Sequence, residues 1–176
     1  NTVIVKDIEE RINRKNSKSN KTRYNKSCKF CNCKYSIFLK GFRRIRRNES
    51  QMKIIENSKV KEKLYVEKLE NGLTVMIIPK KGIQKKYVIW GTNYGSNDSK
   101  FIVPGETNET EVPKGVAHFL EHKMFEQESG VNSLDTLTAL GVDANAYTTN
   151  DHTAYLFECT ENFYPALDEL MDYVQH

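Results

Sequence analysis

The chain has 176 residues, a length that suits one domain with a hydrophobic core plus an additional segment. Of its residues 38% are hydrophobic and 28% charged, and its formal net charge is +4. No apolar run approaches the roughly 20 residues of a membrane span, and the basic N-terminal end lacks the apolar stretch and cleavage site of a secretory signal. Four cysteines, three of them close together, do not match a disulfide framework, so a reducing, cytoplasmic setting and no membrane partner are expected.

The charge is divided sharply near residue 51. Residues 1–51 contain 15 Lys and Arg against 4 Asp and Glu, a net charge of +11, whereas residues 52–176 contain 12 against 19, a net charge of −7. We therefore expect two parts: a basic segment at 1–51, expected to be disordered apart from a short helix around Val3–Arg14, and an organised part at 52–176. Because the stretch from Met52 reads like the start of a protein, the basic segment is also interpreted as an upstream extension.

Two features of the basic segment leave alternatives open. Cys28, Cys31 and Cys33 have a spacing that suits a shared zinc ion or iron–sulfur cluster, but no nearby Cys or His supplies a fourth ligand, and reduced thiols in a flexible tail explain them as well. The run FRRIRR at Phe42–Arg47, with aromatic residues before it, suits nucleic-acid binding. Such basic tails are mostly solvated, so nucleic acid is not the expected partner.

Strands and turns are expected from Leu64 onward. The stretch LYVEKLENGLTVMIIP alternates apolar and polar residues, turns at Asn71-Gly72 and continues as an apolar run, which is typical of a β-hairpin. A third strand is predicted from Lys86, in KYVIWGTNYGS. The acidic stretch NDSKFIVPGETNETEVPKG then exceeds a simple turn and predicts a long loop.

Two helices are predicted next. Pro113 suits the start of the first helix, whose apolar positions are Val116, Phe119, Leu120 and Met124. The stretch NSLDTLTALG predicts a short second helix, with Ser133 near its N-cap and Gly141 at its end.

Two strands and a final helix complete the pattern. The strands flank Asn150-Asp151, and the second runs over Thr153–Cys159. The helix is expected to be capped by Thr160 and to carry an apolar face of Phe163, Leu167, Leu170 and Val174. This order predicts an α+β fold in which helices pack on a mainly antiparallel sheet.

The segment KGVAHFLEHKMFE contains the chemistry-bearing residues His118, Glu121 and His122. Side chains at i and i+4 share one helix face, so the two histidines can present two imidazoles to one metal ion. Neutral imidazole is a good zinc ligand. Glu121 precedes His122 by one residue and so lies beside the face that the two histidines share, where it can act as general base towards a zinc-bound water. A buried helix that happens to carry two histidines is the alternative, and cobalt, nickel or copper would also accept imidazole.

The motif and two further segments carry a family resemblance. LENGLTVMIIPKK, GVAHFLEHKMFE and GVDANAYTTNDHTAYLFECT, in this order over residues 64–176, resemble the N-terminal part of a pitrilysin/insulysin-type (M16) metallopeptidase, an inverted zincin with the pattern H-x-x-E-H. The fullest likeness is to bacterial cytoplasmic members associated with elongation factor P modification. The basic segment has no counterpart in it.

The resemblance implies roles for five residues. His118 and His122 would bind Zn²⁺, Glu121 would be the catalytic base, and Asn145 and Ala146 would lie on an edge strand that an extended substrate joins through backbone hydrogen bonds. On the strand that follows this edge strand, His152 and Tyr155 are expected to have packing roles.

The resemblance also implies parts beyond this chain. The third ligand, a glutamate on a later helix, is expected beyond residue 176, because Glu161 and Glu169 do not match its place. A second M16-like domain or subunit is expected as the partner, with a peptide or small protein as substrate. The chain alone is therefore expected to bind zinc weakly and cleave nothing.

Three functions remain open from the sequence. The first is a zinc-dependent endopeptidase, the second a non-catalytic M16-like partner subunit, and the third a nucleic-acid- or metal-binding adaptor that acts through residues 1–51. The intact H-x-x-E-H pattern favours the first, because a non-catalytic subunit has no need of all three residues.

Overall fold

The computed structural model describes residues 35–40, 52–69, 72–103 and 106–175, the first of these ranges as backbone only. The expected helix at Val3–Arg14, the three cysteines of the basic segment and the FRRIRR run lie outside the described residues. The described elements, in chain order, are β1 (Tyr35–Lys40), β2 (Lys53–Asn57), β3 (Glu62–Lys68), β4 (Thr74–Ile78), β5 (Lys86–Thr92), β6 (Lys100–Ile102), β7 (Glu109–Glu111), α2 (Val116–Lys123), α3 (Ser133–Ala139), β8 (Asp143–Thr148), β9 (Thr153–Cys159) and α4 (Phe163–Tyr173).

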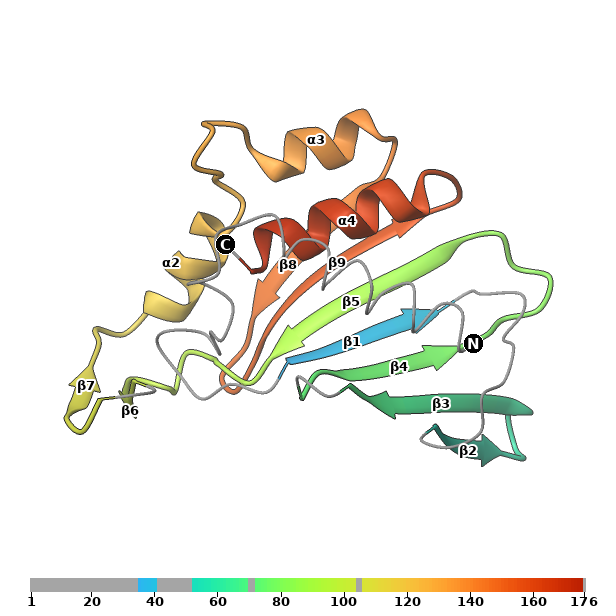
Figure 1. Cartoon of the computed structure of the whole chain (residues 1–176), viewed down its shortest axis with the longest axis horizontal. Helices are drawn as coiled ribbons and strands as arrows, with labels where there is room; N and C mark the ends of the chain where they lie inside the picture. The colour runs from blue at the N-terminus through green and yellow to red at the C-terminus, as the bar shows by residue number, and fades with distance from the viewer. Residues whose placement is uncertain (1–34, 41–51, 70–71, 104–105, 176) are drawn as a thin grey trace.

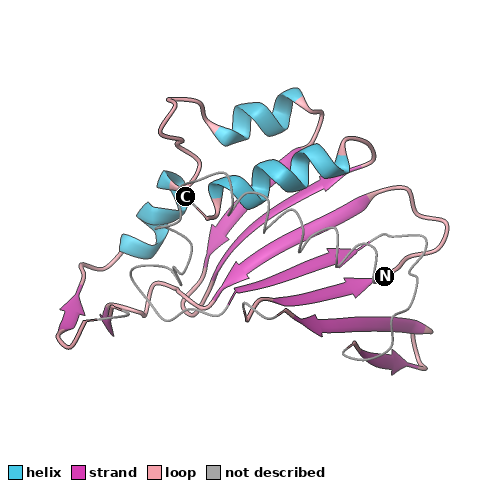
Figure 2. Ribbon diagram, viewed as in Figure 1, coloured by secondary structure: helices cyan, strands magenta, loops and turns pink. Residues whose placement is uncertain are grey.

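The main sheet has the strand order β2-β3-β4-β1-β5-β9-β8, and β6 and β7 form a separate two-stranded ribbon. All neighbouring pairs in the main sheet are antiparallel except β1 and β4, which are parallel. The helices gather at the β8–β9 end, and β2 and β3 form the opposite end (Figure 1). Figure 2 shows the same division between helices and strands. The predicted α+β class, with a mainly antiparallel sheet, is confirmed.

The strand β1 differs from what the sequence predicts. It comes from the segment expected to be disordered, and its backbone pairs with Thr74–Ile78 on one side and with Tyr87–Thr92 on the other. The stretch YSIFLK is rich in residues that favour strands, but it is short and surrounded by a basic, polar composition. Its pairing partners lie more than 30 residues along the chain, which local patterns do not reveal.

The hairpins follow the sequence closely. β3 and β4 pair on either side of the Asn-Gly step, and Gly72 adopts a φ of 89°, in the left-handed region that favours glycine. β8 and β9 pair with Thr148 opposite Thr153, as the predicted strands around Asn150-Asp151 require. The polar stretch predicted as a loop contains the β6–β7 ribbon.

The core lies between the sheet and α4. The predicted apolar face of this helix is confirmed, since its four residues are at most 6% exposed. They pack with side chains of β4, β5 and β9, among them Val75, Val88 and Phe157. Burying a side chain of this size contributes about 1.5–3 kcal/mol, so this layer anchors the helix on the sheet.

The starts of α3 and α4 differ in how well they were predicted. Ser133 lies next to the N-cap of α3, as predicted: the cap is Asn132, whose side-chain oxygen accepts a hydrogen bond from the Leu134 N–H at 2.8 Å. For α4 the prediction of a Thr160 cap is wrong. The N-cap is Asn162, which adopts a φ of 51° and uses its side-chain amide to donate to the Leu140 carbonyl instead. None of the described helices is long and apolar enough to cross a membrane.

Candidate functional site

The helix α2 separates the three motif residues onto two faces. It begins after Gly115, whose φ of 91° is in the left-handed region, and it runs for eight residues. Glu121 is 5% exposed and faces the protein, whereas His118 and His122 are exposed. Residues three and four apart share a helix face, so the two imidazoles lie side by side, with the carboxylate at their inner edge.

The two imidazoles of α2 are in contact. Their Nε2 atoms lie 3.1 Å apart, and the ring centroids are 4.8 Å apart at an interplanar angle of 72°. Two nitrogen ligands of a tetrahedral zinc ion, each 2.0–2.1 Å from it, are about 3.3 Å apart. The pair His118 and His122 therefore fits two positions of one zinc ion. The same distance also suits an N–H···N hydrogen bond in which one ring donates.

Glu121 is a buried carboxylate that requires a polar partner, because an unpaired buried charge is costly. Its Oε2 accepts a hydrogen bond of 2.6 Å from the Thr148 hydroxyl of β8. The same oxygen lies 3.6 Å from Nδ1 of His118. The carboxylate is thus held against the inner face of the histidine pair by the neighbouring strand.

Sequence reasoning missed Thr148. It lies two residues after Ala146, on the same face of β8, and the strand-like alternation of DANAYT was the available signal. What the sequence alone does not provide is the approach of α2 to β8, which brings a hydroxyl 27 residues along the chain into contact with Glu121.

The strand β8 ends the main sheet, with β9 as its neighbour among the described strands. The Thr149 N–H donates to the His152 carbonyl at 2.8 Å and closes the hairpin. Hydrogen-bonded and non-hydrogen-bonded pairs alternate in an antiparallel ladder, so the pair Ala146 and Tyr155 is non-hydrogen-bonded. The Ala146 N–H therefore points to the open edge, where the Asn145 side-chain oxygen accepts from it at 2.8 Å.

The surroundings of Tyr155, His152 and Phe119 can be compared with what the sequence predicts. Tyr155 is buried and contacts the rings of Phe125 and Tyr173, as its predicted packing role requires. Nδ1 of His152 lies 2.6 Å from Oδ1 of Asp151, and this hydrogen bond is the largest cause of a lowered pKa at that carboxyl. Phe119, one of the apolar positions of the predicted helix, is 59% exposed and does not join the core.

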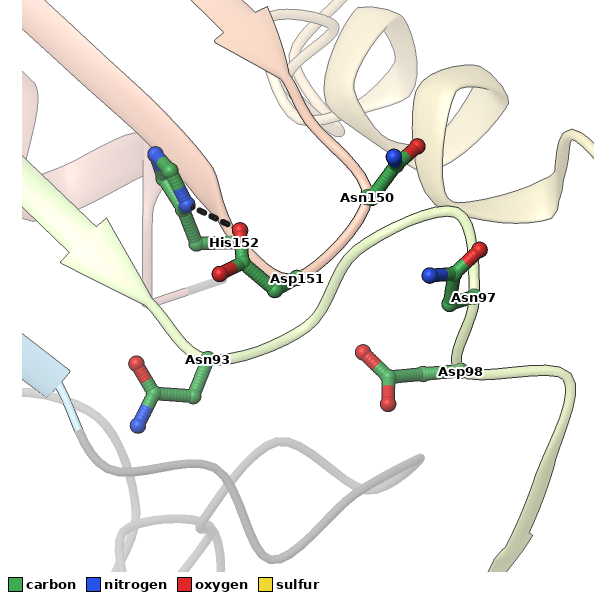
Figure 3. A pocket seen from close by; sticks show the side chains of 6 residues that line it. All are labelled: Asn93, Asn97, Asp98, Asn150, Asp151 and His152. Carbon is green, nitrogen blue, oxygen red and sulfur yellow. Dashed lines mark hydrogen bonds and ion pairs between the residues drawn. The ribbon is translucent and has the colours of Figure 1, made fainter.

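Polar side chains also line an open surface hollow of about 490 Å³, formed by Asn93, Asn97, Asp98, Asn150, Asp151 and His152 (Figure 3). The Asp98 carboxylate accepts from the Gly95 N–H, and Asp151 pairs with His152, so both carboxylates already have partners. None of the residues that line this hollow belongs to α2. Among the described residues, no group of three or more His, Cys, Asp or Glu side chains is arranged to hold a metal ion.

Comparisons with known proteins point to one family. The family model "Insulinase (Peptidase family M16)" matches residues 100–176. The "Uncharacterized zinc protease YmfH" of Bacillus subtilis is 44% identical over 124 residues, which are 70% of this chain and 29% of that protein. The comparisons support peptidase family M16. The M16 match includes α2, β8 and β9, which carry the site described above.

Two solved structures have a similar fold. A putative M16-like peptidase from Alicyclobacillus acidocaldarius is 37% identical, covers 69% of this chain and 27% of its own, and has a TM-score of 0.60. Pitrilysin, at 22% identity and a TM-score of 0.53, supports the fold alone and covers 72% of this chain and 13% of its own. The chain thus spans less than a third of the length of the relatives that it matches.

Proposed function

We propose that the protein carrying this chain is a zinc-dependent endopeptidase. The observation that carries the proposal is the pair of imidazoles on α2, with Nε2 atoms 3.1 Å apart and a buried carboxylate beside them. The name of the Bacillus subtilis relative, a zinc protease, supports the same activity. His118 and His122 would hold the zinc ion, and the third ligand would come from beyond residue 176.

Glu121 is the general base in this proposal. When bound, the zinc ion would supply the Lewis acidity that acidifies a water molecule and polarises the scissile carbonyl. Glu121 removes a proton from the attacking water, whose oxygen forms the new bond to the carbonyl carbon. The same carboxyl group then gives the proton to the amine as the C–N bond breaks. Proton transfer of this kind contributes about 10²–10⁴-fold to the rate.

The edge of β8 is the proposed binding site for the peptide substrate. Because the Ala146 N–H points away from β9, its direction suits a hydrogen bond to an extended peptide laid along the edge. In the structure the Asn145 side-chain oxygen accepts a hydrogen bond from that N–H, so the Asn145 side chain would have to turn away when the peptide binds. The direct contact between β8 and Glu121 would keep such a peptide beside the catalytic base.

A second M16-like domain or subunit is the proposed partner. One relative is named as a subunit, the mitochondrial-processing peptidase subunit beta of Dictyostelium discoideum, and another as cytochrome b-c1 complex subunit 1 of Mus musculus. A non-catalytic subunit stays the alternative, which the intact histidine pair and Glu121 disfavour. A cytoplasmic setting, the link to elongation factor P modification and the adaptor role of residues 1–51 stay predictions from the sequence.

Zinc analysis and peptide cleavage test the proposal together. The complete gene product should bind about one zinc ion, and a His118→Ala/His122→Ala variant should lose it. Glu121→Gln should keep the zinc and lower cleavage of peptides by about 10²–10⁴-fold, because the amide cannot accept the proton.

Other results would change the assignment. Zinc that remained in the double variant would point to Cys28, Cys31 and Cys33. Full activity in Glu121→Gln would refute the role of this residue, and wild-type protein that binds zinc but cleaves no peptide would favour the non-catalytic subunit.

A further inference from the structure

We infer that Thr148 is a positioning residue for the catalytic base: its hydroxyl fixes the Oε2 atom of Glu121 and leaves Oε1 to exchange the proton. The inference rests on the proposed function, because it assigns Glu121 the role of general base. Thr148 was not among the residues that the sequence singled out.

The contact between the two residues is short and buried. The Thr148 hydroxyl lies 2.6 Å from Oε2 of Glu121, and the Glu121 side chain is only 7% exposed. A hydroxyl that donates to a carboxylate forms a charge-assisted bond of about 2.5–2.7 Å, roughly twice as strong as a neutral one. Both the length and the burial of this contact suit a bond of that kind.

A second threonine fixes the direction of the Thr148 proton. The hydroxyl of Thr153, which is 2% exposed, donates to the Tyr94 carbonyl at 2.8 Å. A carbonyl only accepts, so the single hydroxyl proton of Thr153 is used there. The Thr148 hydroxyl lies 3.3 Å from that of Thr153 and 2.6 Å from Glu121, so its own proton goes to the carboxylate.

These contacts join three elements of the M16-like sheet to α2. Tyr94 lies two residues after the end of β5, Thr153 begins β9, and Thr148 ends β8, where it is paired with Thr153. The orientation of the carboxylate therefore depends on the sheet and not on α2 alone. With Oε2 held by Thr148 and near His118 Nδ1, the carboxylate cannot rotate freely about its last bond, so Oε1 is the oxygen left to take the proton of the attacking water. A base held in this way avoids the cost of being ordered in each turnover.

Two substitutions separate the hydroxyl from the shape of the side chain. In the complete gene product, Thr148→Val keeps the β-branched shape and removes the hydroxyl, whereas Thr148→Ser keeps the hydroxyl. Cleavage of a fluorogenic peptide should show kcat lowered about 10- to 100-fold in Thr148→Val, which corresponds to one lost bond to a charged group. KM should change less than about twofold, zinc content should not change, and Thr148→Ser should retain most of the activity.

A double-mutant cycle tests the same contact without relying on activity. Thr148→Val should lower the urea midpoint of the wild-type protein, because it leaves a buried carboxylate unpaired. In a Glu121→Met background, which has no carboxylate, the same change should lower the midpoint much less.

Two results would overturn the inference: equal midpoint shifts in the two backgrounds, or a kcat of Thr148→Val within about twofold of wild type. A clear coupling in a wild-type protein that cleaves nothing would instead refute the proposed function, and with it the catalytic meaning of the contact.

Discussion

Gly95→Ala is predicted to destabilise the fold strongly, although the backbone angles at this position do not require a glycine. Its φ is not in the left-handed region, so the constraint is space alone. A Cβ at this position would lie 2.4 Å from the Asp151 nitrogen and 2.5 Å from the Asn150 carbonyl carbon, where ordinary contact begins at 3.4 Å. The two backbone segments would have to separate by about 1 Å, since the atoms in the way are backbone atoms that cannot turn aside.

That separation breaks contacts around the β8–β9 turn. Ser96 and Asn97 donate backbone hydrogen bonds to Thr149 and Asn150 at 2.9 and 3.0 Å, and both bonds depend on the close approach at Gly95. Two lost bonds at about 0.5–1.5 kcal/mol each, added to overpacking of about 1–3 kcal/mol, give a destabilisation of about 2–6 kcal/mol. The turn directly follows Thr148, so the substitution should also disturb its contact with Glu121.

Urea unfolding followed by circular dichroism would measure this loss. Asn97→Ala is the matched control, because it removes a neighbouring exposed side chain and keeps the backbone bond; it should cost less than about 0.5 kcal/mol. If Gly95→Ala were as stable as this control, the close approach of the two segments would not exist in the folded protein.

Three further results are expected. Leu167→Ala, at a fully buried position of α4, should lower the free energy of unfolding by about 2–5 kcal/mol, whereas Glu169→Ala on the same helix should lower it by less than about 1 kcal/mol. Similar urea midpoints for the two variants would argue against the packing of α4 on the sheet. Burial raises the pKa of the Cys159 thiol, so little of the reactive thiolate is present at pH 8. Mass spectrometry should therefore find Cys159 unmodified by iodoacetamide at pH 8 in the folded chain and modified in urea. Rapid labelling without urea would contradict its burial. The hydrogen bond from His152 lowers the pKa of Asp151 below its ordinary value of 3.8, so this bond stabilises the fold above pH 3.8 and its contribution is lost as the pH falls through the lowered pKa. The difference in urea midpoint between wild type and Asp151→Asn should therefore shrink below pH 3.8. A difference that stayed constant with pH would exclude this linkage.

Local patterns were sufficient for most of the elements from residue 62 onward. The Asn-Gly hairpin, the strand Thr153–Cys159 and the apolar face of α4 all follow from alternation, turn residues or helical spacing within the element itself. The paired histidines are also a local feature, since a spacing of four residues on any helix brings them together. These parts of the fold and site could be predicted because they depend on short sequence separations.

The parts that could not be predicted depend on contacts between distant segments. The strand β1 is placed by pairing with β4 and β5, and its own composition is too short a signal. Phe119 was marked as an apolar helix position, but the face that α2 turns to the protein is set by Ala117 and Glu121. Likewise, Thr148 became a candidate only because β8 lies against α2.

The orientation of α2 separates the assembly of the fold from the loading of metal. Glu121, on the inner face, receives its hydrogen bond from the protein itself, whereas His118 and His122 lie on the outer face and bury little. In a zinc finger, by contrast, the metal replaces a missing core and the apo chain is unfolded. Here the residues that form the core do not include His118 or His122. We therefore expect zinc to bind to and dissociate from a surface that is already folded, so that chelators would remove the ion without unfolding the sheet.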